Sequence, residues 1–118
     1  WKIVNINNIK PRKEEWPKGL HSIGYQMDIT GFGINGKTVN KGENLTPAHT
    51  EQDTNQQEVF VILSGSAEFS LDGIKHKVGP GFILALEPSF MRSAKPLEDN
   101  KTVQSLGGEP GKAYKPSW

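Results

Sequence analysis

The 118-residue sequence lacks cysteine altogether, and its 14 basic and 13 acidic side chains nearly cancel to a net charge of +1. Without cysteine there can be no disulfides, thiolate nucleophiles or thiolate metal ligands, which suits a reducing compartment, so we expect a cytoplasmic protein. The balanced charge, with no arginine-rich stripe or block of lysines, argues against a nucleic-acid partner.

Long apolar runs are also missing from the sequence. No segment reaches the roughly 18 apolar residues of a membrane span, and the N-terminus lacks the apolar core of a signal peptide, so we expect no membrane association. A chain of this length has room for one domain with one core. Hydrophobic residues at 34% together with 13 glycines indicate an ordinary globular composition.

Short β-type runs separated by glycine and proline dominate the chain from Ile23 onward, and no window shows the spacing of a long amphipathic helix. The sequence therefore predicts an all-β domain. We expect an irregular N-terminal arm over residues 1–22, a β-barrel over residues 23–106 and a C-terminal tail over residues 107–118. Four aromatic side chains are expected to dock the arm and the tail on the barrel: Trp1, Trp16, Tyr114 and Trp118.

The clearest element is a β-hairpin in which residues 67–71 and 74–78 alternate around Asp72-Gly73, a dipeptide that tolerates positive φ. A two-residue turn places Phe69 opposite His76. One face of the hairpin is predicted to line the barrel interior, so that His76 is either a core histidine or a ligand contact. That face comprises Ala67, Phe69, Leu71, Ile74, His76 and Val78.

Residues 59–63 and 82–86 are apolar at every position, which indicates strands that are buried on both faces. One face of each strand would line the barrel. The other face needs a cover, either a second sheet, the N-terminal arm or another subunit. On this basis we expect a homodimer.

Several residues together resemble the motifs of the cupin superfamily. Gly42, His49 and Glu58, then six residues and Gly65, resemble the first cupin motif, and Pro80-Gly81 resembles the opening of the second. Over nearly the whole chain the sequence is similar to a group of small bacterial single-domain cupins without an established reaction. The resemblance implies a double-stranded β-helix, the jelly-roll barrel called RmlC-like. The stretches that carry the closer similarity are residues 31–35, 49–51, 57–59, 63–65, 92–94 and 107–114.

Metal-binding cupins present two histidines and a glutamate from the first motif and a histidine from the second. Here Glu51 follows His49 where that resemblance would place a histidine, and Arg92 stands at the last histidine position. Because a guanidinium cannot ligate a metal and repels a cation, we favour a site without metal. Glu58 and Arg92 would then form a bidentate ion pair inside the barrel, unless Arg92 reaches water from a strand end. The alternative is iron, manganese, nickel or zinc held by His49, Glu51 and Glu58.

Three classes of function remain open, since the same barrel carries them all. We favour a binding domain for a small organic molecule, expected to be anionic, inside the barrel with Arg92 as its polar anchor. The second is an enzyme: a metal-dependent dioxygenase or isomerase, or a metal-free isomerase or lyase with a histidine or glutamate as base. The third is a structural or regulatory dimer. The predicted ligand pocket comprises His49, Glu58, Phe60, Ile62, Phe69, His76 and Arg92.

Overall fold

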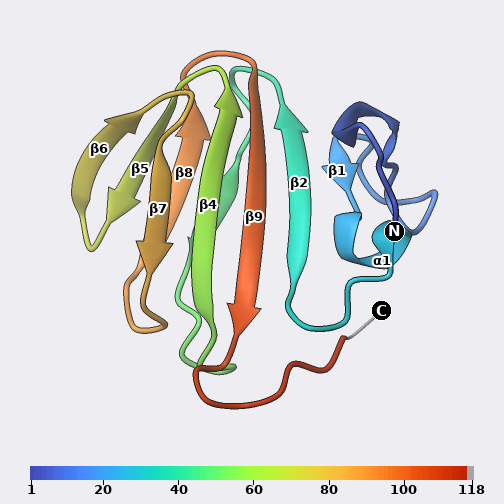
Figure 1. Ribbon diagram of the computed structural model, residues 1–118. Helices are drawn as coiled ribbons and strands as arrows, with labels where there is room; N and C mark the ends of the chain where they lie inside the picture. Colours follow the sequence, from blue (N-terminus) through green and yellow to red (C-terminus); the bar gives the residue numbers. More distant parts are fainter. Residues whose placement is uncertain (117–118) are drawn as a thin grey trace.

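The computed structural model describes residues 1–116, residues 105 and 106 by their backbone only. Within that range two antiparallel sheets face each other (Figure 1), a five-stranded sheet of order β1-β2-β9-β4-β7 and a four-stranded sheet of order β3-β8-β5-β6. The all-β prediction is confirmed. The elements are the 3-10 helix η1 (Ile6–Asn8), β1 (Leu20–His21), α1 (Ile23–Met27), β2 (Ile34–Val39), β3 (Thr46–His49), β4 (Gln57–Ser64), β5 (Ala67–Leu71), β6 (Ile74–Val78), β7 (Ile83–Leu86), β8 (Arg92–Pro96) and β9 (Asn100–Gly108).

The β5–β6 hairpin has the predicted register, with Phe69 opposite His76 and Ala67 opposite Val78. Both turn residues adopt positive φ, 48° at Asp72 and 83° at Gly73, as the dipeptide predicts. The turn is also held from outside, because the backbone N–H at Met91 donates to Oδ1 of Asp72 at 2.8 Å.

The core lies between the two sheets and follows from the alternation along β4, in which Glu58, Phe60 and Ile62 are buried and the residues between them are not. Phe60 from the five-stranded sheet meets Phe69 from the four-stranded sheet edge to face, with ring centroids 5.1 Å apart. The buried hydrophobic cluster comprises Leu45, Phe60, Ile62, Ala67, Phe69, Val78, Leu86 and Ala94.

Gly65 makes the tight turn from β4 into β5, at the closing glycine of the first predicted motif. Its φ is +70°, and a Cβ at this position would lie 2.1 Å from the carbonyl oxygen of Asp99. A side chain therefore cannot be accommodated here without moving the backbone that precedes β9.

The predicted interior position of His76 is wrong, because its side chain is exposed, and Ile74 on the same strand is 65% exposed. The alternation assigned these residues correctly to the face that they share with Phe69. However, β6 is the edge strand of its sheet. A residue at an edge can face the inner side and still reach solvent.

The predicted arm is more regular than expected and packs on β2 through Ile6 rather than through Trp1. The arm contains η1 and β1, and Ile6 packs over Gly36 of β2. Trp1 is fully exposed, so its predicted docking is wrong, whereas the half-buried Trp16 lies under the cations of two neighbouring side chains.

At the other end of the chain, β9 continues to Gly108, two residues into the predicted tail, and Tyr114 lies beside Gly108. Trp118 is outside the described residues. No helix in residues 1–116 is long and apolar enough to cross a membrane.

Candidate functional site

Glu58 and Arg92 meet between the two sheets, from β4 on one side and the start of β8 on the other. Both side chains are 0% exposed, and Nη1 of Arg92 donates to Oε1 of Glu58 at 2.8 Å. The predicted interior pairing is confirmed, while its predicted bidentate geometry is not, because one nitrogen–oxygen contact joins the two groups.

The rest of this ion pair is satisfied by its surroundings. Nη2 of Arg92 donates to the carbonyl oxygens of Glu87 and Phe90, at 2.7 and 3.0 Å, and Nε donates to the Phe90 carbonyl at 3.2 Å. The side-chain amide of Gln104 on β9 donates to Oε2 of Glu58. A buried ion pair persists only when its remaining donors and acceptors are bonded in this way. The guanidinium of Arg92 is therefore already bonded to groups of the protein, so it is not available to bind a ligand as predicted.

His49 ends β3 beside this pair, with its ring held between two acceptors. Its Nδ1 lies 2.7 Å from the carbonyl oxygen of Pro47, and its Nε2 lies 2.9 Å from Oε1 of Glu51. The carbonyl can only accept, so Nδ1 carries a proton. Nε2 is then the ring nitrogen that faces the Glu51 carboxylate.

His49, Glu51 and Glu58 can be tested as a metal site, because their ligand atoms lie within 4.8 Å of one another. Imidazole and carboxylate suit divalent iron, manganese, nickel and zinc. The bond from Nδ1 of His49 to a backbone carbonyl is the support that metal-ligating histidines usually have. Glu58, however, already uses both oxygens, and the Arg92 cation lies against it. The group fits a metal ion only in part, because His49 and Glu51 bond to each other and Glu58 is occupied by Arg92 and Gln104.

Phe60, Ile62 and Phe69, which were predicted to line a pocket, are each at most 1% exposed. They fill the space between the sheets by packing against one another. They belong to the packed core between the two sheets and do not line an open cavity.

Lys37 is a site residue that sequence reasoning missed. It lies on β2, directly opposite Leu20 of β1, and its ammonium group donates to the Leu45 carbonyl at 2.8 Å. Burial lowers the pKa of Lys37 because desolvation disfavours the charged form, and the negative charge of Glu58 partly offsets this by raising the pKa. A lysine in a polar stretch such as Ile34–Val39 normally indicates a solvent-facing side chain, so no sequence signal distinguished it.

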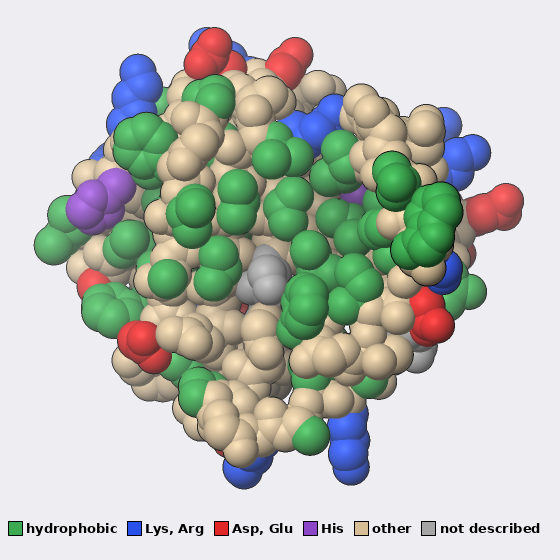
Figure 2. Space-filling model, viewed as in Figure 1, with side chains coloured by type: hydrophobic (Ala, Val, Ile, Leu, Met, Phe, Trp, Pro, Cys, Tyr) green, Lys and Arg blue, Asp and Glu red, His purple; other side chains and the backbone are tan. Residues whose placement is uncertain are grey.

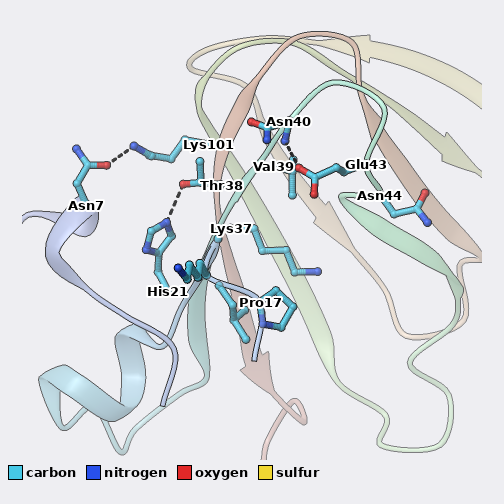
Figure 3. Close-up of a pocket in the computed structure, with 13 residues that line it drawn as sticks. Asn7, Pro17, His21, Lys37, Thr38, Val39, Asn40, Glu43, Asn44 and Lys101 are labelled. Atoms are coloured by element: carbon cyan, nitrogen blue, oxygen red, sulfur yellow. Dashed lines mark hydrogen bonds between the residues drawn. The ribbon is translucent and has the colours of Figure 1, made fainter. Parts of the chain in front are cut away.

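A cavity of about 880 Å³ lies against Lys37, between the N-terminal arm, β2 and the loop that follows β2. Lys37 extends from β2 into the space bounded by Pro17 and by the loop that carries Glu43 and Asn44 (Figure 3). The lining includes Lys18 and Lys101 as well, so three lysines face one glutamate around the cavity.

His21 also lines this cavity but is committed to holding the arm in place. Its Nδ1 lies 2.6 Å from the Ile9 carbonyl and its Nε2 lies 2.7 Å from the hydroxyl of Thr38. With both ring nitrogens bonded and the side chain buried, His21 joins the arm to β2 and does not offer a free base.

No protein-family model matches this chain, and neither does any curated protein. Solved structures match it by shape. A cupin protein from Bacteroides fragilis superposes with a TM-score of 0.67 at 18% identity and covers 90% of each chain. An RmlC-like cupin from Shewanella frigidimarina gives 0.60 at 12% identity, covering 70% of each chain.

A third structure, described as a putative sugar phosphate isomerase from Acidithiobacillus ferrooxidans, superposes with a TM-score of 0.65 at 17% identity. The match covers 73% of this chain and 56% of that one. At these identities the comparisons establish the fold and leave the ligand open.

Proposed function

We propose that this chain, which has the cupin fold, binds a small organic anion in the cavity between its N-terminal arm and β2, with Lys37 as the anchoring cation. The observation that carries the proposal is the half-buried ammonium of Lys37 at the cavity wall. Among the described residues its one hydrogen bond goes to the Leu45 carbonyl, which leaves two N–H groups for a ligand.

The charge around the cavity favours an anion over a neutral molecule. Lys18, Lys37 and Lys101 outnumber Glu43, the one acidic side chain in the lining. An anion beside Lys37 would replace part of the hydration that the ammonium loses on burial, and such charge-assisted bonds are the strong ones. The proposed ligand class therefore matches the class expected from the sequence, at a different place and with a different anchor.

The size and lining of the cavity also suit a small organic molecule. Its volume of about 880 Å³ lies within the range of about 300–1,000 Å³ that is usual for ligand sites. Pro17, Leu20 and Val39 supply apolar surface beside the lysines. The description of one neighbour as a putative sugar phosphate isomerase is in accord with an anionic ligand, although that likeness is one of fold.

Calorimetric titration with matched probes tests the proposal. Glucose 6-phosphate and succinate should bind and glucose should not, because only the first two carry the charge that Lys37 would pair. The Lys37→Met variant should weaken binding at least about 10-fold, since a hydrogen bond to a charged group contributes about 1.5–3 kcal/mol. Lys77→Met, which removes an exposed lysine of β6, is the matched control and should bind as the parent does. Equal binding by the Lys37→Met variant would rule out this anchor.

A second candidate function is metal-dependent chemistry of the dioxygenase or isomerase type at His49, Glu51 and Glu58. The observation that favours it is the convergence of three ligand atoms within 4.8 Å. The metal would be iron, manganese, nickel or zinc.

Metal content per chain distinguishes the two candidates. The protein purified without a histidine tag should carry less than about one-tenth of an equivalent if Arg92 occupies the metal position, and near-stoichiometric metal would favour the second candidate. Arg92→His removes the competing cation and adds an imidazole, so it should raise zinc uptake several-fold. Glu68→Gln, on the outer face of the barrel, is the control and should leave uptake unchanged.

A further inference from the structure

The outer face of the five-stranded sheet is apolar where β4, β7 and β9 lie side by side. The outward positions of β4 are Val59, Val61 and Leu63, and Ile83 and Ala85 of β7 stand opposite Val61 and Val59. Leu63 is 45% exposed and Ile83 is 69% exposed. Figure 2 shows hydrophobic side chains gathered across the middle of this face. Val103 of β9 extends the patch on the other side of Val61.

The described terminal segments of the chain cover other parts of the molecule. Ile6 of the arm and Ile23 of α1 pack over Gly36 on β2, and Tyr114 of the tail lies beside Gly108 at the end of β9. The arm lies beside β2, away from β7 (Figure 1). Within residues 1–116, these terminal segments thus leave the patch on β4, β7 and β9 uncovered.

We propose that the cover is a second copy of this chain, joined by a two-fold axis through the outer face of β4, β7 and β9. A two-fold interface sets the same patch against itself, so any charge in the patch would meet its own like charge. The six residues of the patch carry no charge, which makes the face complementary to itself.

The dimensions of the face set the area that such an interface could bury. β4 has eight residues, or about 26 Å at about 3.3 Å per residue, and three strands about 4.8 Å apart span about 14 Å. Their product, about 370 Å² in projection, is about half of the roughly 800 Å² per partner that stable interfaces bury. The accessible area is larger than this projection because the side chains make the surface uneven.

The test compares two isoleucines of nearly equal exposure. Ile83 is 69% exposed inside the patch, and Ile74 is 65% exposed on β6 of the other sheet. Sedimentation velocity over a concentration series should find the parent chain and Ile74→Asp as dimers. Ile83→Asp should raise the dimer dissociation constant at least about 100-fold, because the interface would bury the new carboxylate twice.

A parent chain that stays monomeric at every concentration would overturn the proposal, and so would an Ile83→Asp variant that stays dimeric. If the Ile74→Asp variant were monomeric while the Ile83→Asp variant stayed dimeric, the interface would lie on the four-stranded sheet, and this result would also overturn the proposal. If circular dichroism shows that Ile83→Asp does not fold, Ala85→Arg serves in its place, since Ala85 is exposed on the same strand. A dimeric Ala85→Arg variant would also contradict the proposal.

Discussion

Two glutamates on consecutive strands form ion pairs with basic side chains, one in the protein interior and the other at the surface. Glu58 of β4 contacts Arg92 at 2.8 Å with both side chains 0% exposed. Glu68 of β5 lies 3.6 Å from Lys95 and 4.0 Å from Lys75, and these two lysines are more than half exposed. The chemistry of the pairs is similar, so the difference in burial should decide what each contributes. Buried charges depend on their partners, whereas water replaces a partner at the surface.

The largest effect is expected when the interior cation, Arg92, is removed. Arg92→Ala leaves Glu58 buried without its counter-charge, and we expect a loss of about 3–5 kcal/mol in the free energy of unfolding. Urea denaturation measures this loss, and Lys77→Ala, at an exposed position on β6, should change stability by less than about 0.5 kcal/mol. A loss below about 1 kcal/mol for Arg92→Ala would show that water reaches Glu58 in the folded protein.

Removing both interior charges should restore much of that loss. In a Glu58→Leu, Arg92→Met double variant no charge is left unpaired, and apolar replacement of a buried pair is often neutral. We expect the double variant to exceed Arg92→Ala in stability by at least about 2 kcal/mol, although Gln104 loses its acceptor. A double-mutant cycle measures the coupling. Additive losses from the two single substitutions would contradict an interaction between Glu58 and Arg92.

Lys37 extends the comparison, because it is a cation near Glu58 that is only half-buried. Burial lowers its pKa below the unfolded value of 10.5, while Glu58 raises it in part. Between the lowered pKa and 10.5 the unfolded chain binds more protons at Lys37 than the folded chain, so this residue makes stability rise with pH. The stability of the parent minus that of Lys37→Met should therefore increase as pH rises towards 10.5. Urea denaturation at pH steps from 7 to 10.5 measures this difference. A flat difference, like the one expected for Lys77→Met, would contradict a desolvated Lys37.

The sequence predicted best where alternation and turn chemistry agree. Asp72-Gly73 between two alternating runs defines the register of β5 and β6, because a two-residue turn permits only one pairing. The unbroken apolar run in β4 predicted burial on both faces, but within this chain only its inward residues are buried, and Leu63 on the outer face is 45% exposed. The pairing of Glu58 with Arg92 came from the cupin resemblance, since no local pattern joins residues 34 positions apart.

The rest of the site depends on distances that a sequence does not contain. Alternation assigns His76 to the inner side, but exposure at that position depends on β6 being an edge strand. Lys37 lies in a stretch without an apolar period, and its partial burial depends on distant segments, the Leu45 carbonyl and the arm residues that line the cavity. The cavity is lined by these separate segments, so no strand considered alone could have predicted it.

The smallest expected effect concerns the outer pair, and it completes the comparison between the two glutamates. Glu68→Ala removes contacts of 3.6 and 4.0 Å to lysines that remain solvated, so the loss in unfolding free energy should be about 0.2–1 kcal/mol. In 1 M NaCl, where the Debye length falls to about 3 Å, this loss should approach zero, whereas the loss from Arg92→Ala should persist because water and ions do not reach the interior. Urea denaturation at about 0.05 M and 1 M NaCl measures both. If high salt reduced the two losses in equal proportion, the pairs would share one dielectric environment, and burial could not be what separates Glu58 from Glu68.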